Sequence, residues 1–386
     1  MSTSSASAHW LAAVFAAVAV AGTVVDAWAG SAPPTTSAAR AVATHAAGAH
    51  ADGFFVATGH LYDPNGVEFR IRGVNRLHWD SRSADGIARS HANTVRWDID
   101  FRRPAPLNVA LVRKDSIRRG IVPVVGNWSA TCSYDPERLQ AVVDTWIAQA
   151  RPWTQLDRYL IVNIANEWGP PDSPIWRDAY VRSIARLRAA GYRGPLLIDS
   201  GGCGQDMGDL LHFAAAVFDS DPLHNVLFAL HVYGDTTRLA IGPDLAQLQS
   251  LEREHGLVFI VGEFGPGRRI GYTPEATTAA EVISACEAHD IGWLAWAWDD
   301  YDLPGGRADD RWFSMTYSGP GQYRSDADLT LFGRDVVLDP HQGLRALARP
   351  ASIFSCPASS TSSPSCEGTA SGPRAARRAS PKEGSP

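Results

Sequence analysis

The stretch Leu160-Ile-Val-Asn-Ile-Ala-Asn-Glu-Trp-Gly169 is mostly apolar and carries no charge before Glu167. Such a run is typical of a strand that is buried on both faces inside a parallel sheet. Its polar residues Asn166 and Glu167 come at the C-terminal end, where Gly169-Pro170-Pro171 begins a loop. In a closed barrel of parallel strands, that end carries the reactive side chains. The stretch therefore predicts a buried barrel strand with a carboxylate at its functional end.

A second stretch has the same pattern. It is Val258-Phe-Ile-Val-Gly-Glu-Phe-Gly265, an apolar run that closes with Glu263 and is followed by Pro266. Two carboxylates at the ends of two buried strands are what glycoside hydrolysis requires, because one protonates the leaving oxygen and the other attacks carbon or activates water. We therefore predict that Glu167 and Glu263 form a catalytic pair.

Eight apolar runs alternate with helical stretches along the middle of the chain. The expected strands are 68–75, 93–98, 121–126, 160–166, 195–199, 226–233, 258–263 and 292–298. Helices are expected over 136–150, 174–190 and 274–289, each with Pro at its start, and over 341–348. Eight alternations predict an α/β fold, a (β/α)8 TIM barrel. A small N-terminal β-hairpin should precede it, with Asp63-Pro64-Asn65-Gly66 as its turn.

The ends of the chain differ in composition from its middle. Residues 10–25 are apolar and Ala27-Trp28-Ala29 follows them, which predicts a signal peptide over 1–29 and a secreted, extracellular protein. Since no Lys or Arg precedes this segment, a low-complexity or membrane-anchoring leader is the alternative. The other expected regions are a disordered linker at 30–52, one catalytic domain at 53–351 and a disordered Ser/Pro/Ala-rich tail at 352–386.

Composition narrows the classes of partner. The net charge is -6 and no long basic run occurs, so we expect no binding to nucleic acid. No Cys/His spacing resembles a zinc site, and we expect neither a metal nor a cofactor. With 386 residues, 45% of them hydrophobic, the chain can form one large core. We expect a monomer that does not bind membranes once its signal is cleaved.

An ordered series of short motifs carries a more specific signal. It comprises Arg72-Gly-Val-Asn75 with His78-Trp79, Ala92-Asn-Thr-Val-Arg96, Asn163-Ile-Ala-Asn-Glu-Trp168, His231-Val-Tyr233, Val261-Gly-Glu-Phe-Gly265 and Gly292-Trp-Leu-Ala-Trp-Ala-Trp298. In this order the motifs resemble glycoside hydrolase family 5 and are most similar to its bacterial endo-β-1,4-mannanase branch. The resemblance implies a retaining (β/α)8 hydrolase that acts on a β-linked polysaccharide without a cofactor.

Position by position, the resemblance makes Glu167 the acid/base and Glu263 the nucleophile. The supporting residues that it implies are Arg96, Asn166, His231, Tyr233 and Trp298. Further substrate-binding candidates near the strand ends are His78, Trp79, Trp168 and Trp296. Within the implied set, Asn166 would reach the sugar 2-OH, and Trp298 would offer a flat floor for the ring at the cleavage point.

Physical chemistry gives the two glutamates different environments. The guanidinium of Arg96 and the hydroxyl of Tyr233 would favour the charged form of Glu263. The charge of Glu263 and an apolar wall from Trp168 would both favour a protonated Glu167. Such a separation lets one carboxyl attack while the other donates a proton.

Two departures from the family pattern leave the sugar open. After the third strand the family usually has a His, whereas this chain has Asn127 or Trp128 at that place. The loop after the eighth strand is acidic, with Asp299, Asp300 and Asp302. A β-mannanase is the first expectation and a β-1,4-glucanase the second. A non-catalytic carbohydrate-binding barrel is a third reading, and the presence of both glutamates argues against it.

Five cysteines in an exported chain suggest disulfides. Cys132 follows the third strand and Cys203 the fifth, so both should lie on the catalytic rim, and we predict that they form a bridge. Cys356 and Cys366 could close a loop in the tail. Cys286 lies within a predicted helix and is expected to be a buried thiol.

Overall fold

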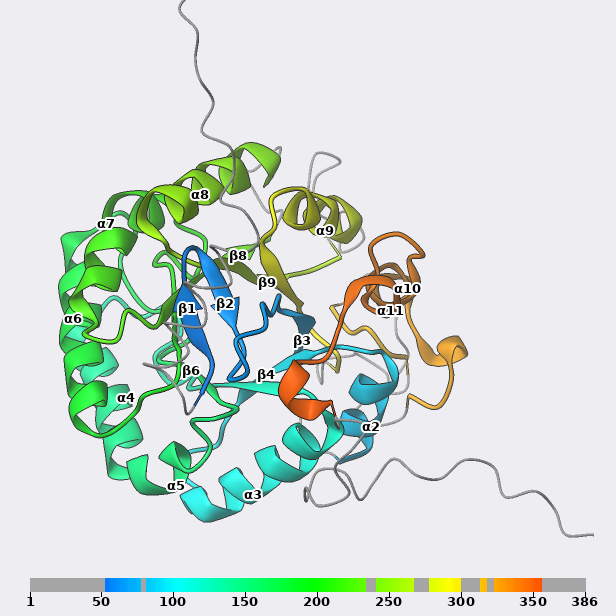
Figure 1. Cartoon of the computed structure of the whole chain (residues 1–386), viewed down its shortest axis with the longest axis horizontal. Coiled ribbons are helices and arrows are strands. Elements are labelled where there is room, and N and C mark those ends of the chain that lie inside the picture. Colours follow the sequence, from blue (N-terminus) through cyan, green and yellow to red (C-terminus); the bar gives the residue numbers. More distant parts are fainter. Residues whose placement is uncertain are drawn as a thin grey trace, which may run out of the picture.

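The computed structural model describes residues 53–77, 81–233, 241–266, 278–299, 313–317 and 323–355. In this part of the chain eight parallel strands form a closed barrel that helices surround (Figure 1). The strands are β3 Arg72–Arg76, β4 Thr94–Asp98, β5 Val122–Gly126, β6 Ile161–Asn163, β7 Leu196–Asp199, β8 Val226–Val232, β9 Phe259–Phe264 and β10 Gly292–Ala295. The last strand pairs with the first, Leu294 opposite Gly73, which closes the sheet. The predicted (β/α)8 barrel is confirmed.

The helices lie outside the barrel. They are α2 Ser81–Arg89, α3 Ala105–Asp115, α4 Pro136–Ala148, α5 Ala150–Thr154, α6 Pro174–Ala189, α7 Met207–Ser220, α8 Ile241–His255, α9 Ala279–Ala288, α10 Leu331–Leu338 and α11 Leu344–Leu347, with short 3₁₀ turns at Ile117–Arg119, Asp326–Asp328 and Ser352–Phe354. Helices α4 and α6 begin at Pro, and the preceding Asp135 and Ser173 accept backbone N–H groups of the first turn. Helix α9 begins with a capping box between Thr278 and Glu281.

Two tryptophans fix helices to the functional end of the barrel. Trp146 of α4 donates its indole N–H to the carbonyl of Ile164, just after β6. Trp176 of α6 donates to the carbonyl of Asp199, the last residue of β7. Both indoles are fully buried. The C-terminal ends of β6 and β7 are therefore held by side chains that come from outside the barrel.

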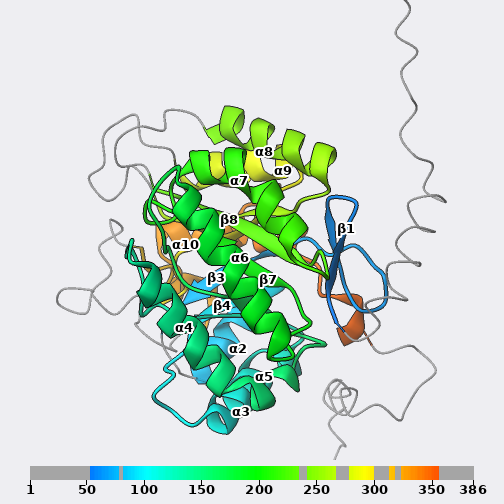
Figure 2. The ribbon, with the colours of Figure 1, turned by 90° about the vertical axis from the view of Figure 1, so that its left-hand side faces the viewer.

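The N-terminal hairpin covers the opposite end of the barrel (Figure 2). Strands β1 Phe55–Ala57 and β2 His60–Tyr62 are antiparallel, and the side chain of Asn225, directly before β8, bonds the backbone of Val56. The hairpin is confirmed, but its predicted turn is wrong. The tight turn is Thr58-Gly59, where both residues have positive φ, as a two-residue hairpin requires. The Asp63–Gly66 turn instead leads to a single bridge between Tyr62 and Glu68.

The described structure continues a few residues beyond the expected end of the catalytic domain at 351. Ser352–Phe354 forms a 3₁₀ turn, the N–H of Ser352 donates to Asp63, and Phe354 stacks on Tyr159. The apolar Ile353 and Phe354 give this short segment a reason to pack on the barrel. Residues 1–52 and 356–386, with the expected leader, linker and remaining tail, lie outside the described residues. Among the described helices, none is long and apolar enough to cross a membrane.

Candidate active site

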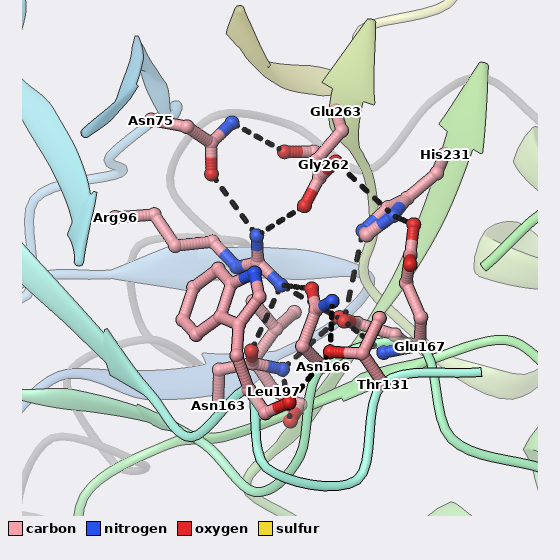
Figure 3. Close-up of polar contacts among 12 residues, drawn as sticks. Asn75, Arg96, Thr131, Asn163, Asn166, Glu167, Leu197, His231, Gly262 and Glu263 are labelled. Carbon is pink, nitrogen blue, oxygen red and sulfur yellow. Dashed lines mark hydrogen bonds and ion pairs between the residues drawn. The ribbon is translucent and has the colours of Figure 1, made fainter. Parts of the chain in front are cut away.

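The C-terminal ends of the barrel strands bring a group of polar side chains into one interior space (Figure 3). The group comprises Asn75 on β3, Arg96 on β4, Asn163, Asn166 and Glu167 on or just after β6, Asp199 on β7, His231 on β8 and Glu263 on β9. All of these side chains except Glu167 belong to buried residues. Because buried ionisable groups are costly unless they are paired, such a concentration marks a functional site.

Arg96 lies at the centre of this group with its guanidinium fully buried. One terminal nitrogen, Nη1, donates to Glu263 Oε1 at 2.6 Å and to Asn75 Oδ1 at 3.0 Å. The acceptors of the other, Nη2, are Asn166 Oδ1 at 2.7 Å, Asp199 Oδ2 at 2.9 Å and Asn163 Oδ1 at 2.9 Å. The guanidinium is thus held by side chains from β3, β6, β7, β9 and the loop after β6.

Glu263 has a hydrogen-bond donor at each carboxylate oxygen. Arg96 donates to Oε1, and the hydroxyl of Tyr233 donates to Oε2 at 2.5 Å. Burial and the adjacent carboxylate raise the pKa of Tyr233, so the phenol keeps its proton and remains a donor. Burial raises the pKa of Glu263, and the neighbouring His231 and Arg96 oppose that rise. The carboxylate is oriented by two donors, as a group that attacks carbon should be.

Glu167 lies in the loop directly after β6, with a φ of 50°. Its Oε1 contacts His231 Nδ1 at 2.8 Å, and its backbone N–H donates to Asp199 Oδ2 at 3.0 Å. Its side chain is 13% exposed, against 5% for Glu263. A carboxyl that exchanges protons with a leaving group and with water needs this greater access.

His231 lies between the two glutamates and is fully buried. Its Nδ1 is 2.8 Å from Glu167 Oε1 and 3.6 Å from Glu263 Oε2. Although burial lowers the pKa of His231, the carboxylates of Glu263, Asp199 and Glu167 raise it above its usual value. A register irregularity in β8 at Leu230/His231 aims the ring into the site.

The loop that precedes α7 approaches this imidazole closely. A Cβ at Gly204, which has a φ of 78°, would lie 2.5 Å from His231 Nδ1, so only glycine fits there. The carbonyl of Gly204 also accepts the backbone N–H of His231 at 2.7 Å. The imidazole is thereby backed by main chain.

Glu167, His231 and Glu263 could in principle offer ligands to a cation. One donor atom each from Glu167, His231 and Glu263 lie within 4.8 Å of one another. Both oxygens of Glu263 already accept hydrogen bonds, and the charge of Arg96 lies 2.6 Å from one of them. This donor set suits proton transfer and nucleophilic attack better than metal binding.

A disulfide joins two loops of this rim. Cys132 follows β5, Cys203 follows β7, and the bridge between them has a Cα–Cα distance of 4.6 Å. The predicted pairing is therefore present. Cys286 of α9 is a buried free thiol, as expected. Cys356 and Cys366 lie outside the described residues.

Comparison with known proteins agrees with this geometry. Residues 124–302 match the family described as Cellulase (glycosyl hydrolase family 5). A mannan endo-1,4-beta-mannosidase from Salipaludibacillus agaradhaerens is 30% identical over 78% of this chain and 96% of that protein. The chain belongs to glycoside hydrolase family 5. Accordingly, it is a glycoside hydrolase.

Solved structures of other proteins resemble this chain. The crystal structure of a β-mannanase from Streptomyces thermolilacinus matches this hydrolase with a TM-score of 0.66 at 27% identity, over 78% of this chain and 99% of that one. A mannohexaose complex of a Thermomonospora fusca β-mannanase matches with a TM-score of 0.65 at 25% identity, over 79% and 100% of the two chains. The similarity covers nearly the whole of both relatives.

Trp128, one of the two residues expected where the family usually has a His, lies against Arg96 in this family 5 hydrolase. The Arg96 guanidinium carbon lies 4.3 Å from the centre of the Trp128 ring, a cation–π contact. Asn127 is turned away, and its Oδ1 accepts hydrogen bonds from the backbone and hydroxyl of Ser129. A Cβ at Gly126 would lie 2.5 Å from the Trp128 ring, so this glycine allows the indole to fold back over Arg96.

Two of the four tryptophans assigned to substrate binding are placed elsewhere. Trp168 is fully buried, packs edge-on against Tyr180 of α6 and donates its indole N–H to Asp135. Glu167 points into the barrel mouth, and the next side chain points outward to the helices. The full burial of Trp168 contradicts its predicted contact with substrate.

Trp298 is only 1% exposed and packs edge-on against Tyr323, so it cannot form the floor for a sugar ring. Strand β10 ends at Ala295, and strand alternation no longer applies beyond it. Trp296, directly after the strand, is partly exposed and remains a substrate-binding candidate. His78 and Trp79 lie outside the described residues.

Asp199 was not among the residues predicted from the sequence, and Asn163 had no predicted role. Asp199 is the last residue of β7 and matches the end of the expected strand at 195–199. The rule that identified Glu167 and Glu263, a polar residue at the C-terminal end of a buried strand, would also have found it. Asn163 was quoted within a motif, but its contacts with Arg96 and Asp199 could not be read from the sequence.

Proposed function

We propose that this family 5 hydrolase is a secreted endo-β-1,4-mannanase that cleaves β-1,4-mannosidic bonds with retention of configuration. The printed names of its relatives support the substrate: a mannan endo-1,4-beta-mannosidase and a β-mannanase in complex with mannohexaose. The pairing of Glu167 with Glu263 supports the mechanism.

The observation that carries the retaining mechanism is the closeness of the two carboxylates. Oxygen atoms of Glu167 and Glu263 lie within 4.8 Å of one another. Retaining enzymes hold their carboxyl groups about 5–5.5 Å apart, whereas inverting enzymes need about 6.5–9.5 Å to admit a water molecule. The short distance leaves direct attack by one carboxylate as the favoured route.

The roles follow from the contacts. Glu263, oriented by Arg96 and Tyr233, attacks the anomeric carbon while Glu167 gives its proton to the leaving glycosidic oxygen. The C–O bond to the leaving sugar breaks, and an ester bond to Glu263 forms. Glu167 then takes a proton from water, and the resulting hydroxide displaces Glu263. His231 at 2.8 Å can supply a hydrogen bond to Glu167 once that carboxyl is charged.

Secretion is supported by two separate features. The apolar segment 10–25 followed by Ala27-Trp28-Ala29 is typical of an export signal. The Cys132–Cys203 disulfide is of the kind that forms and persists in an oxidising compartment. We expect the protein in the culture medium of the producing cell. N-terminal sequencing of that protein should place its first residue near residue 30. Intact residues 1–29 on the purified protein would favour an anchored or retained leader.

A substrate panel tests the proposal. Reducing ends released from mannan, glucomannan, carboxymethyl-cellulose and xylan should show the highest specific activity on mannan. The β-1,4-glucanase alternative is favoured by the family description, Cellulase, and greater activity on carboxymethyl-cellulose would establish it. Proton NMR of a cleaved β-manno-oligosaccharide should show the β-anomer first. An initial α-anomer would disprove retention.

A further inference from the structure

Asp199 is a fully buried carboxylate that the mechanism above does not use. It is the last residue of β7, and its backbone carbonyl is fixed by the indole of Trp176. In the described structure its basic neighbours are Arg96 and His231, both inside the site. A buried charge in this place needs a reason, because its removal from water is costly.

The contacts of Asp199 reach the main catalytic groups at once. Its Oδ2 accepts Nη2 of Arg96 at 2.9 Å and the backbone N–H of Glu167 at 3.0 Å. Its Oδ1 accepts Nδ2 of Asn163 at 3.0 Å. These three donors come from β4, from the end of β6 and from the loop that follows it. A single carboxylate therefore sets the distance between Arg96 and the backbone of the acid/base.

Asp199 also faces the histidine that contacts Glu167. His231 Nε2 lies 3.6 Å from Asp199 Oδ2, and within the described structure this buried nitrogen makes no hydrogen bond. On the other side of the ring, Nδ1 lies 2.8 Å from Glu167 Oε1. Asp199 thus approaches Glu167 twice: through its backbone N–H, and through the imidazole that contacts its carboxyl.

We propose that Asp199 is a positioning residue for the acid/base, which fixes the backbone of Glu167 directly and favours the imidazole orientation that presents Nδ1 to its carboxyl. This inference rests on the proposed function, in which Glu167 first gives and then takes a proton. Glu167 has a φ of 50°, a conformation that side-chain-bearing residues seldom adopt, so its backbone needs such support.

The chemistry requires a carboxylate at this position. Asp199 accepts three N–H groups and donates none. An asparagine would turn an NH2 group toward at least one of those donors, and it would remove the negative charge beside Arg96. Asp199→Asn keeps the shape of the side chain and changes only these two properties.

The test separates the two steps of the reaction. Asp199→Asn should lower kcat on mannan about 100-fold, within the range of general acid–base catalysis. A 2,4-dinitrophenyl β-mannobioside has a leaving group that departs without a proton. With this substrate, the rate of the initial burst of dinitrophenolate should stay within about tenfold of that of the parent enzyme. Steady-state turnover should still be slow, because the second step needs Glu167 as a base. Azide should accelerate it, since azide attacks the sugar without a base.

Asp221→Asn is the matched control. Asp221 is also fully buried and also pairs with an arginine, Arg188 at 2.7 Å, but it lies before β8, away from the site. This variant should lower the melting temperature and leave the kinetics of the folded enzyme unchanged, without azide acceleration. If Asp199→Asn does not fold, Asn163→Ala removes one donor from Asp199 and should show the same pattern with a loss of about tenfold.

Glu167→Ala, measured in parallel, separates failure of this inference from failure of the proposed function. If Glu167→Ala itself shows neither a burst nor azide acceleration, the assigned role of Glu167 is wrong. Suppose that Glu167→Ala behaves as expected, whereas Asp199→Asn lowers the burst rate and the steady-state rate by the same factor. Asp199 would then act through Arg96 on the nucleophile, and the inference would be wrong. Parent activity in Asp199→Asn would also overturn the inference.

Discussion

Cys132 contacts Glu167 at two points. The backbone N–H of Cys132 donates to the carbonyl of Glu167 at 3.1 Å, and the Sγ of Cys132 lies 3.6 Å from Glu167 Oε2. Cys132, Glu167 and Cys203 all have φ values between 50° and 56°. Such left-handed conformations are unfavourable for residues with side chains, so the surrounding contacts must hold them. The disulfide connects the two loops that make these contacts.

The first prediction concerns this bridge. Cys132→Ser/Cys203→Ser should lower the free energy of unfolding by about 2–4 kcal/mol, because the bridge closes a long loop. It should also lower kcat on mannan, because Glu167 loses part of its support. Dithiothreitol should have the same effects on the parent enzyme and none on the double variant, which serves as the control. An unchanged kcat in the double variant would show that the bridge is only structural.

The second prediction separates the two glutamates. Glu167→Ala should nearly abolish mannan hydrolysis but spare the first step with a dinitrophenyl glycoside, whose leaving group needs no proton. Glu263→Ala removes the nucleophile and should abolish turnover of both substrates. A 2-fluoro mannoside followed by peptide mapping should place the covalent sugar on Glu263. A sugar found on Glu167 would reverse the assignment.

The third prediction concerns Tyr233, which donates a 2.5 Å hydrogen bond to Glu263. Tyr233→Phe removes a donor that stabilises the carboxylate anion, so the pKa of Glu263 should rise further. The acidic limb of the pH profile of kcat/KM should move to higher pH, because attack needs the charged form. A hydrogen bond to a charged group contributes about 1.5–3 kcal/mol, so kcat/KM of Tyr233→Phe should fall by roughly 10- to 100-fold. An unmoved acidic limb would show that Tyr233 does not control this ionisation.

The fourth prediction compares two tryptophans that are two positions apart. Trp296 is partly exposed, whereas Trp298 is buried against Tyr323. Trp296→Ala should raise KM for mannan with little change in melting temperature. Trp298→Ala should cost about 3–5 kcal/mol of stability, as for other buried aromatic side chains. The reverse pattern would restore Trp298 as the sugar platform.

The fifth prediction concerns Glu252 of α8, a residue only 9% exposed that accepts the backbone N–H of Phe259 at 2.9 Å. Burial raises the pKa of Glu252 to about 7. The folded state therefore holds a proton that the unfolded chain releases near its ordinary pKa of 4.5. This contribution to stability is complete below that pH and is lost as the pH rises toward 7.

Glu252→Gln should remove this loss. At pH 8 the variant should be more stable than the parent by about 3 kcal/mol, and near pH 4.5 the two should match. Thermal unfolding at both pH values is the measurement. Glu254→Gln on the same helix, at an exposed position, is the control and should change neither value. If the parent and Glu252→Gln have the same free energy of unfolding at pH 8, the ionised side chain of Glu252 does not destabilise the folded state.

Local patterns were sufficient for the barrel and for the placement of Glu167 and Glu263 at its C-terminal end. A strand buried on both faces must be apolar, so the apolar runs before Glu167 and Glu263 could be recognised as barrel strands. A charged residue at the C-terminal end of such a strand is expected at the mouth of the barrel. The spacing of Cys132 and Cys203 after two strands of the same barrel likewise placed both on one rim. These features depend on position along a strand, which the sequence records directly.

Only the tertiary structure decided which neighbours meet. Asp199 is 32 residues from Glu167 and 103 from Arg96, and its contacts with both arise because β4, β6 and β7 converge at one end of the barrel. Trp168, Trp296 and Trp298 look alike in sequence, but helix packing and the chain path after Ala295 decide which of them is exposed. Side-chain direction beyond the end of a strand follows from packing against distant residues, and no local period encodes it.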